Sequence, residues 1–506
     1  MQNLVHDLVF DSADRFGAVE ALCDRNLSLS YPQFANQIDS IARAFSRLGL
    51  QRRDRLAIYL PKQLETAISM FATNLAGGVF VPVNPVLKAN QVQHILNDCN
   101  VRVLVTSNSR IPVLETILSD CHDLHTVIVL EQEQGIPEIP GIRFLTWNEI
   151  REEEQTKRLP DVIDMDMAAI LYTSGSTGKP KGVVLSHRNI VTGAKSVAEY
   201  LRIKADDRIL AVLPFSFDYG LNQMIASVLC GASCILMDYL LPRDVIRAVA
   251  SAKITGLAAV PPLWVQLAQI EWPESINTHL RYLTNSGGKM PETTLKVLRA
   301  AVPNAEFFLM YGLTEAFRST YLPPELIDAK PGSIGKAIPN AEILVVREDG
   351  SPCGVNEPGE LVHRGSLVAM GYWNDPAKTA ERFKPCPSQL EGLPMTEIAV
   401  WSGDTVVKDE EGYLYFVGRR DDMIKTSGYR VSPTEVEEVI YKSGLAGEAA
   451  VLGIPHPALG QAIVVAASPP AHHDRIDQAG LISFCKQELP NFMVPLEIRE
   501  FQSLPR

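Results

Sequence analysis

Short apolar runs alternate with amphipathic segments through much of the chain, and this alternation limits the folds open to it. Buried strands are predicted at residues 56–60, 79–83 and 103–106, with helical patterns at 64–75 and 91–98 between them. Strands that alternate with helices favour parallel sheets whose two faces are covered by helices. We therefore expect an α/β fold with a large N-terminal domain of layered parallel βα sheets.

The same alternation resumes in the second half and places motifs at the ends of strands. The strands predicted there span residues 209–213, 231–237, 255–260 and 306–311. Three of them run into the motifs 215–222, 261–264 and 312–315. Ligands of open α/β sheets bind at the carboxyl ends of strands. We therefore expect a composite pocket formed by these three motifs.

Local patterns predict where some elements begin and where the chain changes character. Ser30, followed by Gln33, is a capping box for the first long helix. Residues 131–160 are rich in Glu, Pro and Gln and are expected to form a surface connection. In the last part of the chain Ser432 is predicted to cap a helix, with Pro433 at its first position and Glu435 at its third.

A polar stretch at residues 171–182 lies between two apolar runs and reads Leu-Tyr-Thr-Ser-Gly-Ser-Thr-Gly-Lys-Pro-Lys-Gly. Glycines let backbone N–H groups converge on phosphate oxygens, hydroxyls donate further bonds and lysines add charge. The common P-loop pattern would need Gly at Thr173 and Ser or Thr at Pro180, so this loop is a different one. Its composition would also fit a plain turn, but the order of its residues indicates a phosphate site.

Bulk properties exclude several classes of protein. A net charge of -12 over 506 residues argues against general nucleic-acid binding. No apolar run reaches the roughly 18 residues of a membrane helix, and the first residues do not resemble a secretory signal, so we expect a cytoplasmic protein without a membrane span. Eight cysteines form no C-x-x-C pair. Cys230 and Cys234, in an apolar context, are interpreted as small core residues, and neither a disulfide framework nor a zinc site is expected.

The string at residues 173–182 closely resembles the signature of the adenylate-forming (ANL) superfamily of acyl-CoA synthetases, non-ribosomal peptide synthetase adenylation domains and luciferases. Further blocks match in the expected order at residues 285–288, 311–315, 402–404 and 418–435. The resemblance covers nearly the whole chain and implies ATP-dependent activation of a carboxylate. It also implies two domains, residues 1–420 for ATP and the acid and residues 421–506 as a small mobile α+β domain with Asp421 as its hinge.

The resemblance implies a role for each residue that matches these blocks. Glu315 and Thr173 would be magnesium ligands, Asp404 and Arg419 would hold the ribose, and Tyr311 would stack on adenine. The expected catalytic residues are Thr173, Lys179, Lys181, Thr314, Glu315 and Lys425. The expected ATP-binding residues are Ser174, Gly175, Ser176, Thr177, Gly178, Gly287, Gly288, Tyr311, Gly312, Asp404 and Arg419. Without the context of these blocks, Glu315 would be interpreted as a solvated surface charge, and Asp404 as the start of a turn.

A second half-reaction is implied in which the acyl group passes to a thiol. The small domain would rotate and bring Gly428 to the wall of a tunnel for phosphopantetheine. The thiol donor is coenzyme A or the phosphopantetheine of a carrier protein, and the sequence does not decide between them.

The segment Phe217-Asp218 is the centre of the expected substrate pocket. It resembles amino-acid adenylation domains, in which the Asp binds the substrate ammonium, and both stand-alone prolyl-carrier ligases and exosortase-associated acyl-CoA ligases look similar here. We hypothesise that Asp218 pairs a substrate amine; the alternative is that protein groups such as Asn222 satisfy it. Arg318 would approach the pocket or form an internal salt bridge. The expected pocket residues are Phe217, Asp218, Tyr219, Asn222, Leu263, Thr284, Ser286, Met310 and Arg318.

These residues together predict an AMP-forming acid–thiol ligase that uses ATP and Mg²⁺. The leading substrate is an amino acid delivered to a carrier protein, with a fatty or other acyl acid delivered to coenzyme A as the alternative and a luciferase-like oxygenase as a third class. Family members usually follow a Leu-Pro-basic segment with a Thr-x-x-Gly-Lys stretch whose Lys contacts the reacting carboxylate. This sequence stops at Arg506, so we expect it to end before that lysine.

Overall fold

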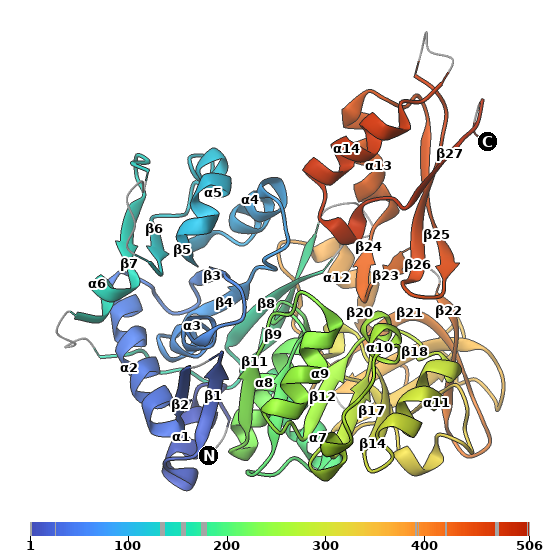
Figure 1. The fold of residues 1–506 in the computed structure, drawn as a ribbon, viewed down its shortest axis with the longest axis horizontal. Coiled ribbons are helices and arrows are strands. Elements are labelled where there is room, and N and C mark those ends of the chain that lie inside the picture. Colours follow the sequence, from blue (N-terminus) through green and yellow to red (C-terminus); the bar gives the residue numbers. More distant parts are fainter. Residues whose placement is uncertain are drawn as a thin grey trace.

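The computed structural model of the chain is mixed α/β, as predicted from the sequence (Figure 1). The part that the structure describes comprises residues 3–25, 27–131, 137–152, 158–173, 180–389, 392, 394–419, 423–470, 475–502 and 504. A large body holds two sheets, and a small body, red in Figure 1, lies against one side of it. No helix in the described ranges is long and apolar enough to cross a membrane.

The larger sheet contains a parallel half and an antiparallel half. Its parallel strands, in spatial order, are β14 (Glu306–Tyr311), β13 (Tyr282–Asn285), β12 (Gly256–Ala259), β10 (Arg208–Ala211), β11 (Ser233–Leu236) and β1 (Glu20–Asp24), and β2 (Leu27–Ser30) pairs antiparallel at the edge. The predicted strands of this half are confirmed, with ends that differ by a few residues.

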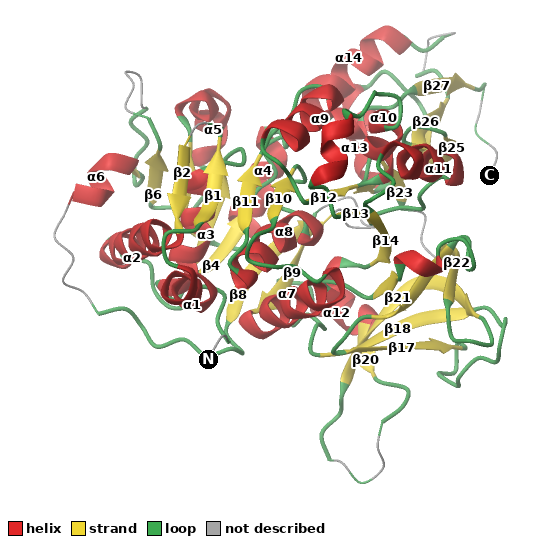
Figure 2. Cartoon of the chain, turned by 60° about the horizontal axis from the view of Figure 1, so that its bottom comes forward, coloured by secondary structure: helices red, strands yellow, loops and turns green. Residues whose placement is uncertain are grey.

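The antiparallel half extends the sheet beyond β14 and forms a separate lobe in Figure 2. Its strands are β15 (Thr320–Leu322), β16 (Ser333–Ala337), β22 (Leu414–Arg419), β21 (Ile398–Lys408), β18 (Gly359–Gly365), β17 (Ala341–Val346) and β20 (Phe383–Pro385). The expectation of parallel layers therefore covers only part of the large body.

The second sheet is parallel except at one edge. Its order is β19 (Gly371–Tyr372), β9 (Lys181–Ser186), β8 (Met167–Thr173), β4 (Val79–Pro82), β3 (Arg55–Tyr59), β5 (Val101–Thr106), β6 (Thr126–Val129) and β7 (Arg143–Thr146). The antiparallel neighbours β8 and β9 flank the polar stretch of the sequence. The two strands therefore fix both ends of that loop, although residues 174–179 lie outside the described ranges.

Helices cover both faces of these sheets and bury apolar stripes against them. The helices of the large body are α1 (Asp7–Phe16), α2 (Tyr31–Arg47), α3 (Leu64–Leu75), α4 (Ala89–Asp98), α5 (Ile111–Leu118), α6 (Trp147–Glu152), α7 (His187–Leu201), α8 (Asp218–Cys230), α9 (Pro242–Ser251), α10 (Pro261–Leu267), α11 (Glu292–Ala301) and α12 (Pro376–Arg382).

The small body has its own hydrophobic core, which supports the proposed division into two domains. Its sheet contains β24 (Tyr429–Val431), β23 (Ile424–Thr426), β26 (Gly460–Ala467), β25 (Ala449–His456) and β27 (Glu497–Glu500), covered by α13 (Pro433–Ser443) and α14 (Gln478–Glu488). The exact boundary stays a proposal, because residues 420–422, which include the expected hinge Asp421, are not described.

The structure bears out one local prediction and corrects two. The capping box of Ser30 and Gln33 is present. Ser432 is at the N-cap of α13 with Pro433 at the first helical position, as predicted, but its side chain makes no capping bond. The Glu435 side chain accepts a hydrogen bond from Gln91 in the large body. Residues 131–160 were expected to form a surface connection, but they also contain strand β7 and helix α6. Their polar composition reflects their position at the exposed edge of the sheet.

Helix α8 begins directly after the loop that leaves β10, and a glycine makes this tight connection fit. A Cβ added to Gly220 would overlap the carbonyl oxygen of Pro214. Because that atom belongs to the backbone, the helix and the loop would have to separate to relieve the contact. The position of Asp218, at the first residue of α8, therefore depends on Gly220.

We predict that Gly220→Ala lowers the free energy of unfolding by about 1–3 kcal/mol, as overpacked sites do. Urea denaturation followed by circular dichroism would measure this. Because alanine has a higher helix propensity than glycine, helix propensity alone predicts an increase in the free energy of unfolding. The control is Gly354→Ala, whose added Cβ would make only an ordinary contact with Glu357. Equal stability of the two variants would contradict the prediction.

Candidate functional site

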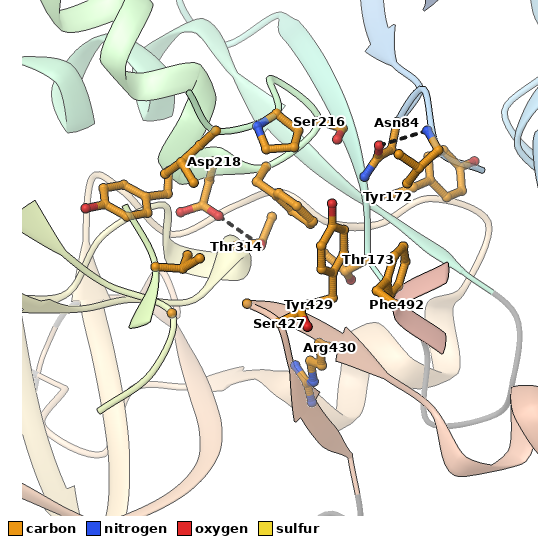
Figure 3. A pocket seen from close by; sticks show the side chains of 18 of the residues that line it. Asn84, Tyr172, Thr173, Ser216, Asp218, Thr314, Ser427, Tyr429, Arg430 and Phe492 are labelled. Carbon is orange, nitrogen blue, oxygen red and sulfur yellow. Dashed lines mark hydrogen bonds between the residues drawn. The ribbon is translucent and has the colours of Figure 1, made fainter. Parts of the chain in front are cut away.

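A cavity of about 420 Å³ lies between the large and small bodies. On the large-body side it is lined by the loops that follow β10, β12, β13 and β14, the edge where the sequence predicted a pocket. Figure 3 shows side chains from both bodies converging on it. Among the predicted residues, those that line it are Thr173, Phe217, Asp218, Tyr219, Ser286, Gly287, Gly312, Thr314, Glu315, Arg318, Asp404, Arg419, Lys425 and Gly428.

At one end of the cavity Asp404 is held by two partners. Arg419 Nε lies 2.7 Å from its Oδ1, and the Tyr311 hydroxyl donates to its Oδ2 at 2.5 Å. Asp404 and Arg419 are direct neighbours across β21 and β22, which explains why residues 15 positions apart in the sequence meet here. The carboxylate is 3% exposed and is thus fixed in place beside the cavity.

Tyr311 therefore has a structural partner that the sequence did not indicate. Its hydroxyl is committed to Asp404, and burial together with that carboxylate raises the pKa of Tyr311 well above its usual value. Tyr311 is not one of the residues that line the cavity. Stacking of its ring on adenine stays a prediction.

Glu315 lines the cavity and is only 4% exposed. The Tyr372 hydroxyl donates to its Oε1 at 2.5 Å, and the Lys181 ammonium lies 4.5 Å from the centre of the Tyr372 ring. Burial acts to raise the pKa of Glu315, but the guanidinium of Arg430, the Tyr372 hydroxyl and the Lys181 ammonium outweigh it and lower the pKa. Glu315 is therefore a buried carboxylate kept in its charged form.

This region suits a magnesium ion that also binds phosphate. The Thr173 hydroxyl oxygen is buried at the end of β8 without a hydrogen-bond partner in the described structure, so it has a free oxygen for a ligand. No three His, Cys, Asp or Glu side chains cluster as a metal site within the described ranges. A cation here would therefore take most of its ligands from phosphates, which is how Mg²⁺ usually binds with nucleotides.

The side of the cavity where the sequence predicted the acid pocket contains a buried ion pair. Arg318 Nη1 lies 3.1 Å from Asp218 Oδ2, and the Thr314 hydroxyl donates to Asp218 Oδ1 at 3.3 Å (Figure 3 shows the second contact). The Asp218 side chain is 12% exposed and that of Arg318 2%. Both expectations for Arg318 are met, because it lines the cavity and also forms an internal salt bridge. The protein partner of Asp218 is the Arg318 guanidinium and not Asn222.

Several predicted pocket residues lie behind the wall of the cavity. The hydroxyls of Tyr219 and Thr284 are 2.6 Å apart, so Thr284 supports a wall residue. Met310 accepts a hydrogen bond from Tyr200 through its sulfur. The predicted residues that do not line the cavity are Lys181, Asn222, Leu263, Thr284, Gly288, Met310 and Tyr311. Ser174, Gly175, Ser176, Thr177, Gly178 and Lys179 lie outside the described residues.

The small body closes the cavity with a β-hairpin made of β23 and β24. Gly428 at its turn has a φ of +81°, and a Cβ there would lie 2.9 Å from Val260 of the large body. The rings of Tyr429 and Phe492 stack at 3.7 Å, and Tyr429 meets Phe217 edge-on at 5.1 Å (Figure 3). An aromatic wall of the cavity is therefore shared between the two bodies.

A buried carboxyl group lies at the same junction. Gln91 Nε2 of α4 donates to Glu435 Oε1 of α13 at 2.9 Å, and Glu435 Oε2 has no partner within the described structure. Burial raises the pKa of Glu435 to about 7, although the contact with Gln91 opposes this. The sequence did not indicate this contact between α4 and α13.

The cavity wall and the groups that contact it also include residues that the sequence analysis missed. Lys62 follows β3 and contacts Asp238 in an ion pair at 2.5 Å. Its position just after a predicted strand could have indicated from the sequence that it lies near the pocket. Tyr372, Tyr429, Arg430 and Phe492 had no such signal, because they reach the site through contacts between distant elements.

We predict that Asp404→Asn weakens the binding of AMP by about tenfold, since hydrogen bonds to charged groups contribute roughly 1.5–3 kcal/mol. Calorimetric titration with AMP would measure this. Asp409→Asn is the matched control, because Asp409 forms its ion pair with Lys330 and does not line the cavity. AMP affinity that is unchanged in Asp404→Asn would contradict this role.

Comparison with known proteins gives the family. A family model described as AMP-binding enzyme matches residues 9–373, and one described as AMP-binding enzyme C-terminal domain matches residues 435–506. A linear gramicidin synthase of Brevibacillus parabrevis is 28% identical, over 100% of this chain but only 6% of that protein. A long-chain-fatty-acid–CoA ligase of Escherichia coli O157:H7 is 27% identical, over 93% of this chain and 87% of the ligase.

Solved structures agree with this assignment. The o-succinylbenzoate CoA synthetase of Bacillus subtilis superposes with a TM-score of 0.83 at 25% identity, over 99% of this chain and 95% of the synthetase. The first family model spans well over half of the sequence. The chain therefore belongs to the AMP-binding enzyme family.

Proposed function

We propose that this chain is an AMP-forming ligase that activates a carboxylic acid with ATP and then transfers the acyl group to a phosphopantetheine thiol. The observation that carries the proposal is a single cavity that brings together the Asp404 and Arg419 pair, the charged Glu315 and the polar acid-pocket wall at Asp218. These groups are of the kinds that acyl adenylate formation needs: a ribose site, a phosphate site and an acid site.

In the first half-reaction an oxygen of the substrate carboxylate attacks the α-phosphorus of ATP, and pyrophosphate leaves with the electrons of the broken P–O bond. Little covalent work falls to the protein, so positioning and charge stabilisation provide the acceleration. Asp404 would accept hydrogen bonds from the ribose hydroxyls. Thr314, beside Glu315, would donate to the α-phosphate, and Lys181 would contribute positive charge near the departing phosphates.

Glu315 and Thr173 would hold a Mg²⁺ ion together with phosphate oxygens of ATP. When bound, the ion neutralises negative charge on the phosphates. The buried, charged Glu315 and the unpartnered hydroxyl of Thr173 support this assignment.

In the second half-reaction a thiol sulfur attacks the acyl carbon, and AMP leaves as the C–O bond breaks. The hairpin of β23 and β24 lies against the cavity, with Lys425 and Gly428 among the residues that line it. This arrangement supports the proposal that the small domain lines the path of the thiol. A thiol on coenzyme A and one on a carrier protein fit the chemistry equally.

Two classes of acid fit the site. An amino acid delivered to a carrier protein is the candidate from the sequence, and the partly exposed Asp218 is consistent with it. An acyl acid delivered to coenzyme A is the second candidate, and the ion pair between Asp218 and Arg318 favours it because the carboxylate already has a cation. The relatives include both gramicidin synthases and a fatty-acid–CoA ligase.

We expect acid-dependent exchange between ATP and pyrophosphate that requires Mg²⁺ and stops when EDTA removes it. Glu315→Gln should lower the exchange rate by about 100-fold, the usual loss when one electrostatic group of a transition state is removed. A panel of amino acids and fatty acids would identify the substrate class. The exposed Glu325→Gln is the control. Exchange that is independent of Mg²⁺ and unaffected by Glu315→Gln would contradict the assignment.

We also expect Gly428→Ala to separate the two half-reactions. A Cβ at this positive φ is strained and would press on Val260, so the hairpin should no longer approach the cavity closely. Thioester formation with coenzyme A or a carrier protein should fall by about tenfold or more, as expected for a loss of roughly 1.4 kcal/mol or more. Pyrophosphate exchange should persist.

The matched control is Gly444→Ala, which has a comparable positive φ at the end of α13 but no neighbouring atom within 4 Å of an added Cβ. If Gly428→Ala reduced both half-reactions equally, or reduced neither, the hairpin would have no separate role in the thiol step.

A further inference from the structure

The ion pair of Arg318 and Asp218 is the most constrained polar feature of the acid pocket, and its role extends the function proposed above. We propose that this pair selects an acid that presents an uncharged hydrogen-bond donor, such as a hydroxyl or an amide N–H, to Asp218, and that it discriminates against an acid with an ammonium group at that place. The inference rests on the proposed adenylation site and names the substrate class of that site.

The charges of Asp218 and Arg318 already balance each other at this part of the cavity wall. Asp218 has a cation 3.1 Å away, and both side chains are largely removed from water. Burial raises the pKa of Asp218, and the Arg318 guanidinium and the Thr314 hydroxyl offset only part of that increase. Glu315 adds a second carboxylate nearby, but Lys181 and Arg430 face it. An added ammonium would therefore be a buried cation without a counter-charge of its own, which is costly.

Arg318 cannot easily leave Asp218 to make room for another cation. Its Nε and Nη2 are buried and have no hydrogen-bond partner among the described residues, so Asp218 is its counter-ion. The guanidinium also lies over the Tyr219 ring at 4.5 Å. A Cβ at Gly312 would lie 3.2 Å from Nη1, so the close approach depends on glycine there. Displacing Arg318 would leave its charge buried and unpaired.

The backbone next to Arg318 is strained, and a packed ring holds it. Phe317 has a φ of +55°, a conformation that side chains other than glycine rarely adopt. Its fully buried ring rests on Gly193 of α7, where an added Cβ would overlap it. Strain of this kind persists only where the surroundings impose it. The fold therefore fixes the direction in which Arg318 leaves the backbone.

Asp218 can still bind a neutral group. A carboxylate offers about four acceptor positions. Arg318 and Thr314 use one on each oxygen, and the Tyr219 backbone N–H uses a third. The side chain remains 12% exposed and lines the cavity, so acceptor capacity faces the substrate. A hydroxyl or amide N–H can use it without adding charge to the wall.

Adenylate analogues would test this directly, without the need for turnover. Three acyl sulfamoyl adenosines that share one carbon skeleton differ only at the α-position: alanyl (ammonium), lactyl (hydroxyl) and propionyl (hydrogen). A second set with phenylalanyl, phenyllactyl and phenylpropionyl groups covers a larger pocket. Calorimetry should show the hydroxyl analogue of the better-fitting set binding about tenfold tighter than its ammonium analogue, the size expected for one hydrogen-bonded group.

Variants at Arg318 test whether the preference for the hydroxyl analogue depends on the ion pair. Arg318→Met should reverse the order, because Asp218 then lacks a cation and the ammonium analogue supplies one. Arg318→Lys should keep the wild-type order. A purely structural role of Arg318 would weaken all three analogues by the same factor and would leave their order unchanged.

The double variant Asp218→Asn with Arg318→Met keeps the proposal testable if Arg318→Met fails to fold, because it removes both charges together. It should bind the ammonium and hydroxyl analogues with the same affinity. The proposal is wrong if the wild type binds the ammonium analogue as tightly as the hydroxyl analogue or tighter, or if the hydroxyl preference survives in the double variant. If no analogue of either set binds, the adenylation site itself is refuted and the inference falls with it.

Discussion

Four parallel strands, β10, β12, β13 and β14, end at one edge of the larger sheet, and the rest of the site depends on this constraint. Their register places the loops that follow them side by side, so that Asp218, Val260, Ser286 and Thr314 surround one cavity. The antiparallel strands beyond β14 add Asp404 and Arg419 from the other side. The position of each functional group thus follows from hydrogen bonds between strands that are distant in sequence.

The site is an assembly of partnered charges. Asp404 has Arg419 and Tyr311, Glu315 has Tyr372 with Lys181 and Arg430 nearby, and Asp218 has Arg318 and Thr314. Each carboxylate is buried, and a buried charge persists only with partners that compensate for lost water. These partners also fix the direction of each carboxylate at the cavity wall.

Sequence patterns predicted the parts of this structure that depend on near neighbours. The capping box at Ser30, the helix at residues 64–75 and the motifs at the ends of strands all arise within a few residues. Patterns of this kind contain no information on contacts between distant elements. Tyr372 contacts Glu315, which is 57 positions away in the sequence. Gln91 contacts Glu435, which is 344 positions away and was expected to take part in a capping box. The sequence offered Asn222 as a protein partner of Asp218, and only the three-dimensional arrangement shows that Arg318 is the partner.

The aromatic wall shared by Phe217, Tyr429 and Phe492 has a consequence for how such ligases diverge. Part of the surface of the cavity belongs to the small body, which has its own core and its own sheet. A chimera with the small body of a relative that has different residues at the positions of Tyr429 and Phe492 would have a different aromatic wall. Recombination at the junction between the two bodies would thus change the shape of the cavity even when every residue of the large body is kept.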